Sequence, residues 1–339
     1  MATADLAGRD RQGNWKPVER IEMIGATRWP PNPGAILQWL FGWPGFLWPW
    51  NALWFGIAAA TWLWLTPPLA TMVTLQPGWI ALLLAPNVAL LVAYVSFFHV
   101  VLHTRRSQGV RYKYNDRWLS KHNRVFMFDD QTFDNAFWSI VSGGGLWTAY
   151  EVLTLWMYAN GALPVLAFRD SPVAWVLMVP AIALFRHAHF YLAHSLLHWR
   201  PLYRAAHYIH HRNVNVGPWS GLSMHWIEHI LYFSGVLIHW IVPSHPVHAI
   251  FHLQHAALSP AAAHCGFDAT ELGHEKAAVT HGSFYHYLHH RYFECNYAGD
   301  DAMILDKWFG SFHDGTPEAH TKMRARAHQR MRDRKDATA

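Results

Sequence analysis

Four long apolar runs limit what this chain can fold into. Residues 48–65 and 79–102 form one pair, and residues 138–160 and 172–197 form a second. Each run is long enough to cross a bilayer as a helix, which takes about 20 predominantly apolar residues. The second pair is less purely apolar than the first. The pattern predicts a protein that buries whole helices in an apolar environment.

Composition and a third pair of runs complete the predicted fold. Charged residues make up 14% of the chain, against about 25% in ordinary soluble domains. Many of the 20 tryptophans lie near the ends of the runs, as in the aromatic belt of membrane proteins. Residues 230–242 and 248–263 are too short for full spans. We therefore predict an all-α fold, a multi-pass transmembrane helical bundle of about four spans plus a short re-entrant or tilted hairpin. A large soluble helical protein is the alternative.

Basic residues predict the orientation. Residues 9–28 contain five Lys or Arg, and residues 105–124 contain seven. The positive-inside rule places both segments in the cytoplasm, so the first two runs form a hairpin. The short loop at 164–172 then lies outside, and the fourth run returns to the cytoplasm. Both termini and a cytosolic histidine-rich cap are predicted on that side.

The chain is predicted to contain one membrane domain. We divide it into a cytosolic N-terminal segment (1–34), a membrane domain (35–315) and a basic cytosolic tail (316–339). The first 30 or so residues lack an apolar core, so no cleavable signal peptide is expected. Cys265 and Cys295 are the only cysteines and form no CxxC, which suits a reducing compartment. No basic patch interleaved with aromatic residues indicates a nucleic-acid partner.

Histidines recur at helical spacing in three places. One HxxxH and two HxxHH segments supply the clusters His194 and His198, then His207, His210 and His211, then His286, His289 and His290. Residues three and four apart share a helix face, so each cluster directs its imidazoles towards one point. Random placement of 26 histidines in 339 residues gives only about 0.15 copies of any one three-histidine pattern.

Eight converging histidines exceed the four ligands of one tetrahedral zinc and predict a dinuclear metal site. Imidazole suits iron, copper, nickel and zinc. A metal transporter would place its ligands at the middle of the spans, whereas these clusters lie at or beyond their predicted cytosolic ends. A zinc-dependent membrane hydrolase would need fewer ligands. Both classes remain open alternatives.

Several stretches resemble one family. The order HxxxH, HxxHH, HxxHH between paired spans and a basic tail resembles the fatty-acid hydroxylase / sterol desaturase superfamily, whose members are integral-membrane non-haem diiron enzymes. The segments that carry the resemblance are PLYRAAHYIHHRN (201–213), MHWIEH (224–229), AHCGFD (263–268), HYLHHRYFECNYAG (286–299) and LDKWFGSFHDG (305–315). It is specific over residues 180–315, and the preceding half matches only in its spans.

The resemblance implies further site residues. His264, at the end of an apolar stretch, becomes the ninth metal ligand. The family commonly has Arg after the first-box histidine and an acidic residue seven positions before it, where this chain has Ser195 and His187. Ligating histidines usually need a hydrogen-bond partner at the other ring nitrogen. The residues that could provide it, or act as extra ligands, are His187, His225, Glu228, His229 and Asn296.

The implied activity is oxidation of a lipid C–H bond. The resemblance implies two iron ions, O2 as co-substrate and an amphipathic lipid substrate. Hydroxylation is favoured over desaturation, and no catalytic residue is predicted beyond the ligands. Because no Gly-rich dinucleotide loop is visible, electrons should come from a separate cytochrome b5, ferredoxin or flavoprotein reductase. That donor would bind the basic cytosolic face, which includes Arg111, Lys113, Arg117 and Lys121.

One carboxyl group inside a predicted span is singled out. Glu151 lies in the third run, where an ionisable residue is costly and is by default a functional candidate. It could line the substrate path or pair with Arg186 of the fourth run. A plain hydrogen bond between packed helices is the equally weighted alternative.

Overall fold

The computed structural model describes residues 9–10, 12–17, 30–43, 45–272, 277–299 and 303–336. Arg11, Arg20 and Arg28, three of the basic residues used to predict orientation, lie outside this part of the chain. So do most of the predicted N-terminal segment and the last three residues of the tail.

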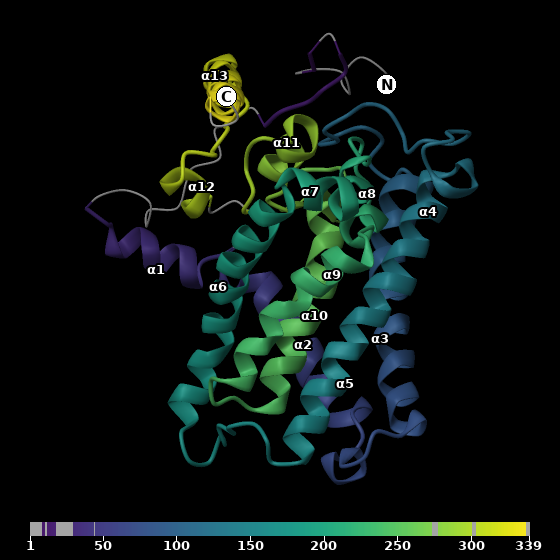
Figure 1. Ribbon diagram of the computed structural model, residues 1–339, viewed down its shortest axis with the longest axis vertical. Helices are drawn as coiled ribbons and strands as arrows, with labels where there is room; N and C mark the ends of the chain where they lie inside the picture. The colour runs from purple at the N-terminus through teal and green to yellow at the C-terminus, as the bar shows by residue number, and fades with distance from the viewer. Residues whose placement is uncertain are drawn as a thin grey trace.

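The four apolar runs form the long helices of the bundle (Figure 1). The first extends from Leu47 to Leu65, with α2 (Ala52–Ala60) between two wider turns, Leu47–Asn51 and Thr61–Leu65, and it is kinked at Trp48, whose backbone is extended. The others are α3 (Pro77–Phe98) with its extension His99–Thr104, then Trp138–Gly144 leading into α5 (Gly145–Ala159), then α6 (Pro172–Leu197). Pro77–Thr104 and Pro172–Leu197 are long and apolar enough to cross a membrane.

The third pair of runs forms a hairpin that lies inside the bundle. It consists of α9 (Trp226–Phe233), a 3-10 segment at Ser234–Trp240, and α10 (Pro246–Ala263). Nearly every residue of α10 is buried, and the helix contacts α2, α3, α5 and α6. Its buried amide has a partner, since Gln254 donates to Thr61 Oγ1 at 2.8 Å. The hairpin predicted as tilted or re-entrant thus contains the central helix of the fold.

The ends of the bundle differ. The loops that join α2 to α3 and α5 to α6 lie at one end, and the shorter helices gather at the other (Figure 1). The short helices at the second end are α4 (Gln131–Phe137), α7 (Arg200–Leu202), α8 (Tyr208–His211), α11 (Phe284–Tyr292) and α12 (Ile304–Trp308), and the longer α13 (Pro317–Asp336) lies there as well. The histidine boxes therefore share one end with the segment that follows α3.

Other short elements complete the chain. They are α1 (Pro33–Phe41), the π-type turn Tyr203–His207, and the 3-10 turns Leu69–Met72, Met127–Asp129 and Pro218–Leu222. Strands β1 (Ala269–Leu272) and β2 (Ala277–Thr280) pair antiparallel. The all-α prediction missed this hairpin, because four-residue strands are too short to leave a clear alternation in the sequence. The fold is otherwise helical, as predicted.

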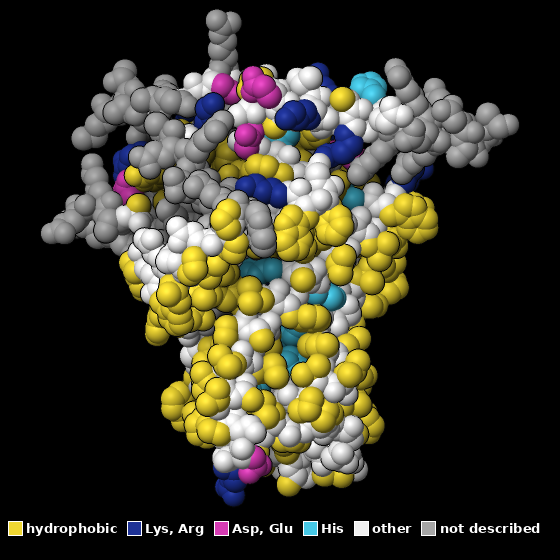
Figure 2. All heavy atoms as spheres, turned by 90° about the vertical axis from the view of Figure 1, so that its left-hand side faces the viewer, with side chains coloured by type: hydrophobic (Ala, Val, Ile, Leu, Met, Phe, Trp, Pro, Cys, Tyr) yellow, Lys and Arg dark blue, Asp and Glu magenta, His cyan; other side chains and the backbone are white. Residues whose placement is uncertain are grey.

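The outer surface of the bundle is apolar. Large hydrophobic side chains such as Leu63, Trp64 and Leu177 are exposed, and Figure 2 shows apolar side chains over most of the face it presents. Charged side chains on this face gather towards the end that carries the short helices (Figure 2). A broad apolar band of this kind is what a helical bundle surrounded by lipid tails requires.

Candidate metal centre

Nine histidines converge in two groups at the end of the bundle that carries the short helices. The first group is His194, His198, His207, His211 and His289, and the second group is His210, His264, His286 and His290. Within each group the potential ligand atoms all lie within 4.8 Å of one another. These nine residues are the ones that the sequence analysis selected as ligands.

The two HxxHH boxes divide their histidines between the groups. In the HxxHH segment at 207–211, His207 and His211 belong to the first group, while His210 belongs to the second. In the other box the sense is reversed, because His286 and His290 face the second group and His289 faces the first. Each box therefore supplies two histidines to one group and one histidine to the other. The groups lie side by side, with the ring centres of His211 and His290 5.0 Å apart.

The Nε2 atoms within each group point at one another. His198 Nε2 lies 3.1 Å from Nε2 of His207 and of His211, and 3.2 Å from that of His289. In the second group His264 Nε2 lies 2.8 Å from His286 Nε2 and 3.1 Å from His290 Nε2. A neutral imidazole has a single N–H, so one nitrogen cannot satisfy three such neighbours.

The opposite ring nitrogens explain which atoms face inward. Nδ1 of His194 lies 2.7 Å from the carbonyl oxygen of Tyr297, and Nδ1 of His289 lies 2.6 Å from that of Cys295. Nδ1 of His264 lies 2.9 Å from the carbonyl oxygen of Pro260. A carbonyl can only accept, so Nδ1 carries the proton and Nε2 presents a lone pair to the group.

A cation satisfies this arrangement better than protein atoms alone. Facing lone pairs repel one another, and a bound metal ion converts that repulsion into coordination. Nδ1 contacts meanwhile hold the rings of His194, His207, His264 and His289. Burial lowers the pKa of His264 to about 4 and that of His207 well below its usual range. The imidazoles are therefore held in the neutral form that binds metal. The donor set fits a pair of metal ions that accept nitrogen ligands.

Glu228 is the carboxyl group that contacts this centre. Its Oε1 accepts from Nδ1 of His207 at 2.7 Å, and the two side chains are 2% and 0% exposed. Burial raises the pKa of Glu228 well above its usual value. The contact places Glu228 where a metal-ligating histidine usually has its orienting partner.

The other residues considered as partners have different contacts. His229 Nδ1 lies 2.8 Å from Ser142 Oγ, and His225 caps α9 by accepting from the backbone N–H of Ile227. The Asn296 amide donates to the carbonyl oxygens of Tyr285 and His313.

His187 lies beside the centre and is not in either histidine group. It lines the adjoining cavity, near the rings of Phe46 and His255. His225 and Asn296 therefore have structural contacts with the backbone, whereas His187 lines the cavity.

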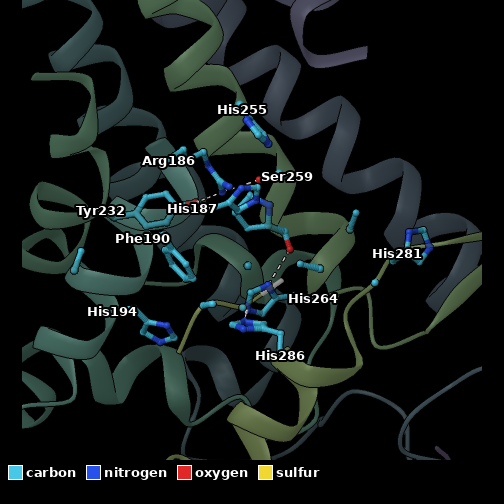
Figure 3. Close-up of a pocket in the computed structure, with 18 of the residues that line it drawn as sticks. Arg186, His187, Phe190, His194, Tyr232, His255, Ser259, His264, His281 and His286 are labelled. Carbon is cyan, nitrogen blue, oxygen red and sulfur yellow. Dashed lines mark hydrogen bonds between the residues drawn. The ribbon is translucent and has the colours of Figure 1, made fainter. Parts of the chain in front are cut away.

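A cavity of about 250 Å³ adjoins both groups. His194 and His207 of the first group and His264 and His286 of the second are among its lining residues. Away from the histidines it is lined by residues of α2, α6 and α10. Figure 3 shows Arg186, His255 and Ser259 at one end and His194, His264 and His286 at the other. A molecule in this cavity would contact residues of both groups.

For Glu151 the structure shows the plain hydrogen bond between packed helices, and for Lys113 it contradicts the expectation. Glu151 is not paired with Arg186, because it accepts from Asn87 Nδ2 at 2.7 Å, within the packed helices. Lys113 is fully buried and donates to the backbone carbonyl of Asn115, so it is not part of a docking surface.

The basic surface is accordingly smaller than expected. Arg111 forms an ion pair with Glu271 at 2.6 Å, which compensates its charge. Arg117, Lys121 and Arg124 remain exposed, and we refer to these three as the exposed basic patch.

Comparison with known proteins finds one matching family and similar proteins. Residues 179–311 match the family described as fatty acid hydroxylase. The chain is 30% identical over 183 residues to a Delta(7)-sterol-C5(6)-desaturase of Nicotiana tabacum, covering 52% of this chain and 65% of the relative. It is 31% identical over 123 residues to a Delta(7)-sterol 5(6)-desaturase of Saccharomyces cerevisiae, covering 36% and 32% respectively. No solved structure gives a significant match.

The matched segment is similar to the fatty-acid hydroxylase / sterol desaturase superfamily, the same family that the histidine boxes resemble. It contains all nine converging histidines and Glu228. The alignments span slightly less than two thirds of the tobacco protein and about one third of the yeast protein.

Sequence reasoning missed the backbone groups that orient the rings. The carbonyls of Pro260, Cys295 and Tyr297 each face an Nδ1 atom. Every residue has a carbonyl, so no residue type signals this role. The one available signal was indirect, because Cys295 and Tyr297 lie only a few residues after the last box.

Proposed function

We propose that the protein is a membrane-bound diiron oxygenase that hydroxylates a C–H bond of a lipid. The observation that carries the proposal is the pair of histidine groups with inward Nε2 atoms beside a cavity. Iron is favoured over zinc because attack on an unactivated C–H bond needs a redox-active metal, and iron can use O2 for that purpose.

The chain's own residues would bind the metal and place the substrate. Nine neutral imidazoles would hold two ions, and outward Nδ1 bonds would prevent four of the rings from turning, those of His194, His207, His264 and His289. The cavity would position a substrate carbon beside His194 and His286, which line it. Burial of the groups would keep bulk water away from the reacting carbon.

The membrane and partner assignments form part of the same proposal. The shared end of the histidine groups and of the segment after α3 supports paired spans, with N- and C-termini and the metal site in the cytoplasm. Electrons would come from a separate cytochrome b5, ferredoxin or flavoprotein reductase. Reporters placed at Arg124 and after Ala339 should then give cytoplasmic signals, and one near Arg169 should give the opposite. Signals from opposite sides at Arg124 and Ala339 would refute the paired spans.

Desaturation at the same site is the second candidate. The names of both relatives are those of sterol desaturases, which favours loss of two hydrogens, and abstraction of one hydrogen can begin either reaction. A zinc-dependent hydrolase remains the alternative from another class.

The test is a comparison of lipids from cells that lack the gene, cells with the protein, and cells with His210→Ala. Cultures should receive isotopically labelled O2. Hydroxylation predicts one lipid class that gains a single labelled oxygen only with the intact protein, and desaturation predicts loss of two hydrogens without label. Hydrolysis products, or products formed equally without oxygen, would refute the oxygenase proposal.

A further inference from the structure

A cationic subsite lies in the cavity beside the metal centre. Arg186 comes from the spanning helix α6 and lines the cavity together with Tyr232, His255 and Ser259 (Figure 3). Charged residues within spans usually face a bundle interior or a cavity and mark the path of a substrate or ion. The position of Arg186 fits that pattern.

Neutral groups hold the guanidinium in place. One terminal nitrogen, Nη2, donates to Ser259 Oγ at 2.8 Å and to the Tyr232 hydroxyl at 3.2 Å. The Tyr232 hydroxyl donates in turn to the carbonyl oxygen of Ala256 at 2.7 Å, so it can only accept from Arg186. These contacts orient the side chain without compensating its charge.

Arg186 has no carboxylate partner among the ion pairs of the described residues. Two buried carboxyl groups of the bundle have other partners, since Glu151 contacts Asn87 and Glu228 contacts His207. An arginine is always protonated at neutral pH. Its positive charge is therefore uncompensated inside an apolar bundle, where an unpaired charge is costly.

Two buried nitrogens at this end of the cavity also lack hydrogen-bond partners. They are Nε of Arg186 and Nδ1 of His255. Buried polar atoms in folded proteins nearly always have partners, and an exception calls for an explanation such as a missing ligand. Both residues line the same cavity, so one ligand could contact both.

We propose that this subsite binds an anionic headgroup, a carboxylate or a phosphate monoester, of the lipid that is oxidised. The inference rests on the proposed function and specifies the substrate class of the same site. A guanidinium binds planar oxyanions through two nitrogens and gains most from a full negative charge. The headgroup would lie on Arg186, and a carbon further along the chain would lie near His194, His264 and His286.

The subsite separates two kinds of substrate. A sterol would offer a neutral hydroxyl, which leaves the charge of Arg186 uncompensated. An acidic lipid supplies the missing charge and brings its hydrocarbon chain into the apolar part of the cavity. Charge complementarity therefore favours an acidic amphiphile over the neutral substrates that the names of the relatives suggest.

The test is equilibrium binding to the full-length, metal-loaded protein in nanodiscs made of zwitterionic lipid. The probes are a long-chain saturated carboxylate, the alkyl phosphate and the primary alcohol of equal chain length. Intact protein should bind one of the two anions about 10–100-fold more tightly than the alcohol. The preferred anion then identifies the headgroup.

Variants distinguish recognition of charge from a structural role. Arg186→Gln should abolish the preference while binding of the alcohol and metal content stay unchanged, and Arg186→Lys should retain part of the preference. Arg169→Gln, in the loop at the other end of the bundle, is the matched control and should behave as the intact protein does. Equal binding of all three probes by the intact protein, or an unchanged preference in Arg186→Gln, would overturn the inference.

The two assays can distinguish failure of the subsite inference from failure of the proposed function. A charge-dependent preference without any O2-dependent product would support the subsite and refute the proposed function. An oxidised neutral lipid, formed at the same rate by Arg186→Gln, would support the proposed function and refute the subsite.

Discussion

Replacement of Glu228 by glutamine should weaken one metal position and spare the other. The carboxylate contacts His207 of the first group at 2.7 Å, and His207 shares its inward side with His194, His198, His211 and His289. Glutamine keeps the shape and the accepting oxygen, so the hydrogen bond to Nδ1 survives while the negative charge is lost.

The expected magnitude follows from the kind of contact. Changes to an orienting partner of a metal ligand typically lower metal affinity by about 10–100-fold, which corresponds to about 1.4–2.8 kcal/mol. Glu228→Ala should cost a further 1–3 kcal/mol, roughly, because the buried Nδ1–H of His207 then has no acceptor. Metal affinity should therefore decrease in the order intact protein, Glu228→Gln, Glu228→Ala.

A chelator competition measures this directly. Protein loaded with ferrous iron under anaerobic conditions should release iron in one narrow range of chelator concentration when intact. In Glu228→Gln half of the iron should leave at about 10–100-fold lower chelator strength, and the other half should leave as before.

The exposed Glu318 on α13 offers a matched control, and Glu318→Gln should release iron as the intact protein does. Equal weakening of all bound iron in Glu228→Gln, or a glutamine variant as weak as the alanine variant, would refute the reasoning.

Three further predictions concern the second group, pH and the electron donor. His210→Ala should remove iron and activity together while the protein stays in the membrane, and an unchanged iron content would contradict its assignment as a ligand. Nδ1 of His313 accepts from a backbone N–H and burial lowers its pKa to about 4, below the unfolded value of about 6.5. The unfolded state therefore binds more protons, and stability should fall as pH drops from about 6.5 towards 4. A thiol-reactive dye can follow unfolding because both cysteines are buried, and His313→Gln should flatten this pH dependence, whereas an unchanged dependence would contradict it. Neutralising the exposed basic patch should slow reduction by a donor protein, most at low salt, while equal rates at all salt concentrations would exclude it as the docking surface.

The helices and the convergence of the candidate ligands could be predicted because they depend on local spacing. Runs of about 20 apolar residues indicate spans whatever their partners, and histidines three and four apart share a helix face. His264 was different, since it stands outside the boxes and was selected from its place at the end of an apolar stretch, with added support from the resemblance of its segment to a known family. The same resemblance drew attention to Glu228.

Spacing could not predict the contacts between distant segments. The apolar runs do not show that α10 is central, because periodicity does not distinguish a buried helix from a lipid-facing one. Arg186 and Glu151 lie on different helices, and only the packing shows that Asn87 occupies the position expected for Arg186. Lys113 looked like a surface cation until its carbonyl contacts were known.

Metal analysis of the purified, full-length protein tests the central claim most directly. Two histidine groups side by side should hold about two iron ions per chain, and His198→Ala and His264→Ala, one from each group, should each lower that content. Protein that contains a single zinc ion and no iron, after expression in iron-replete cells, would contradict the diiron assignment.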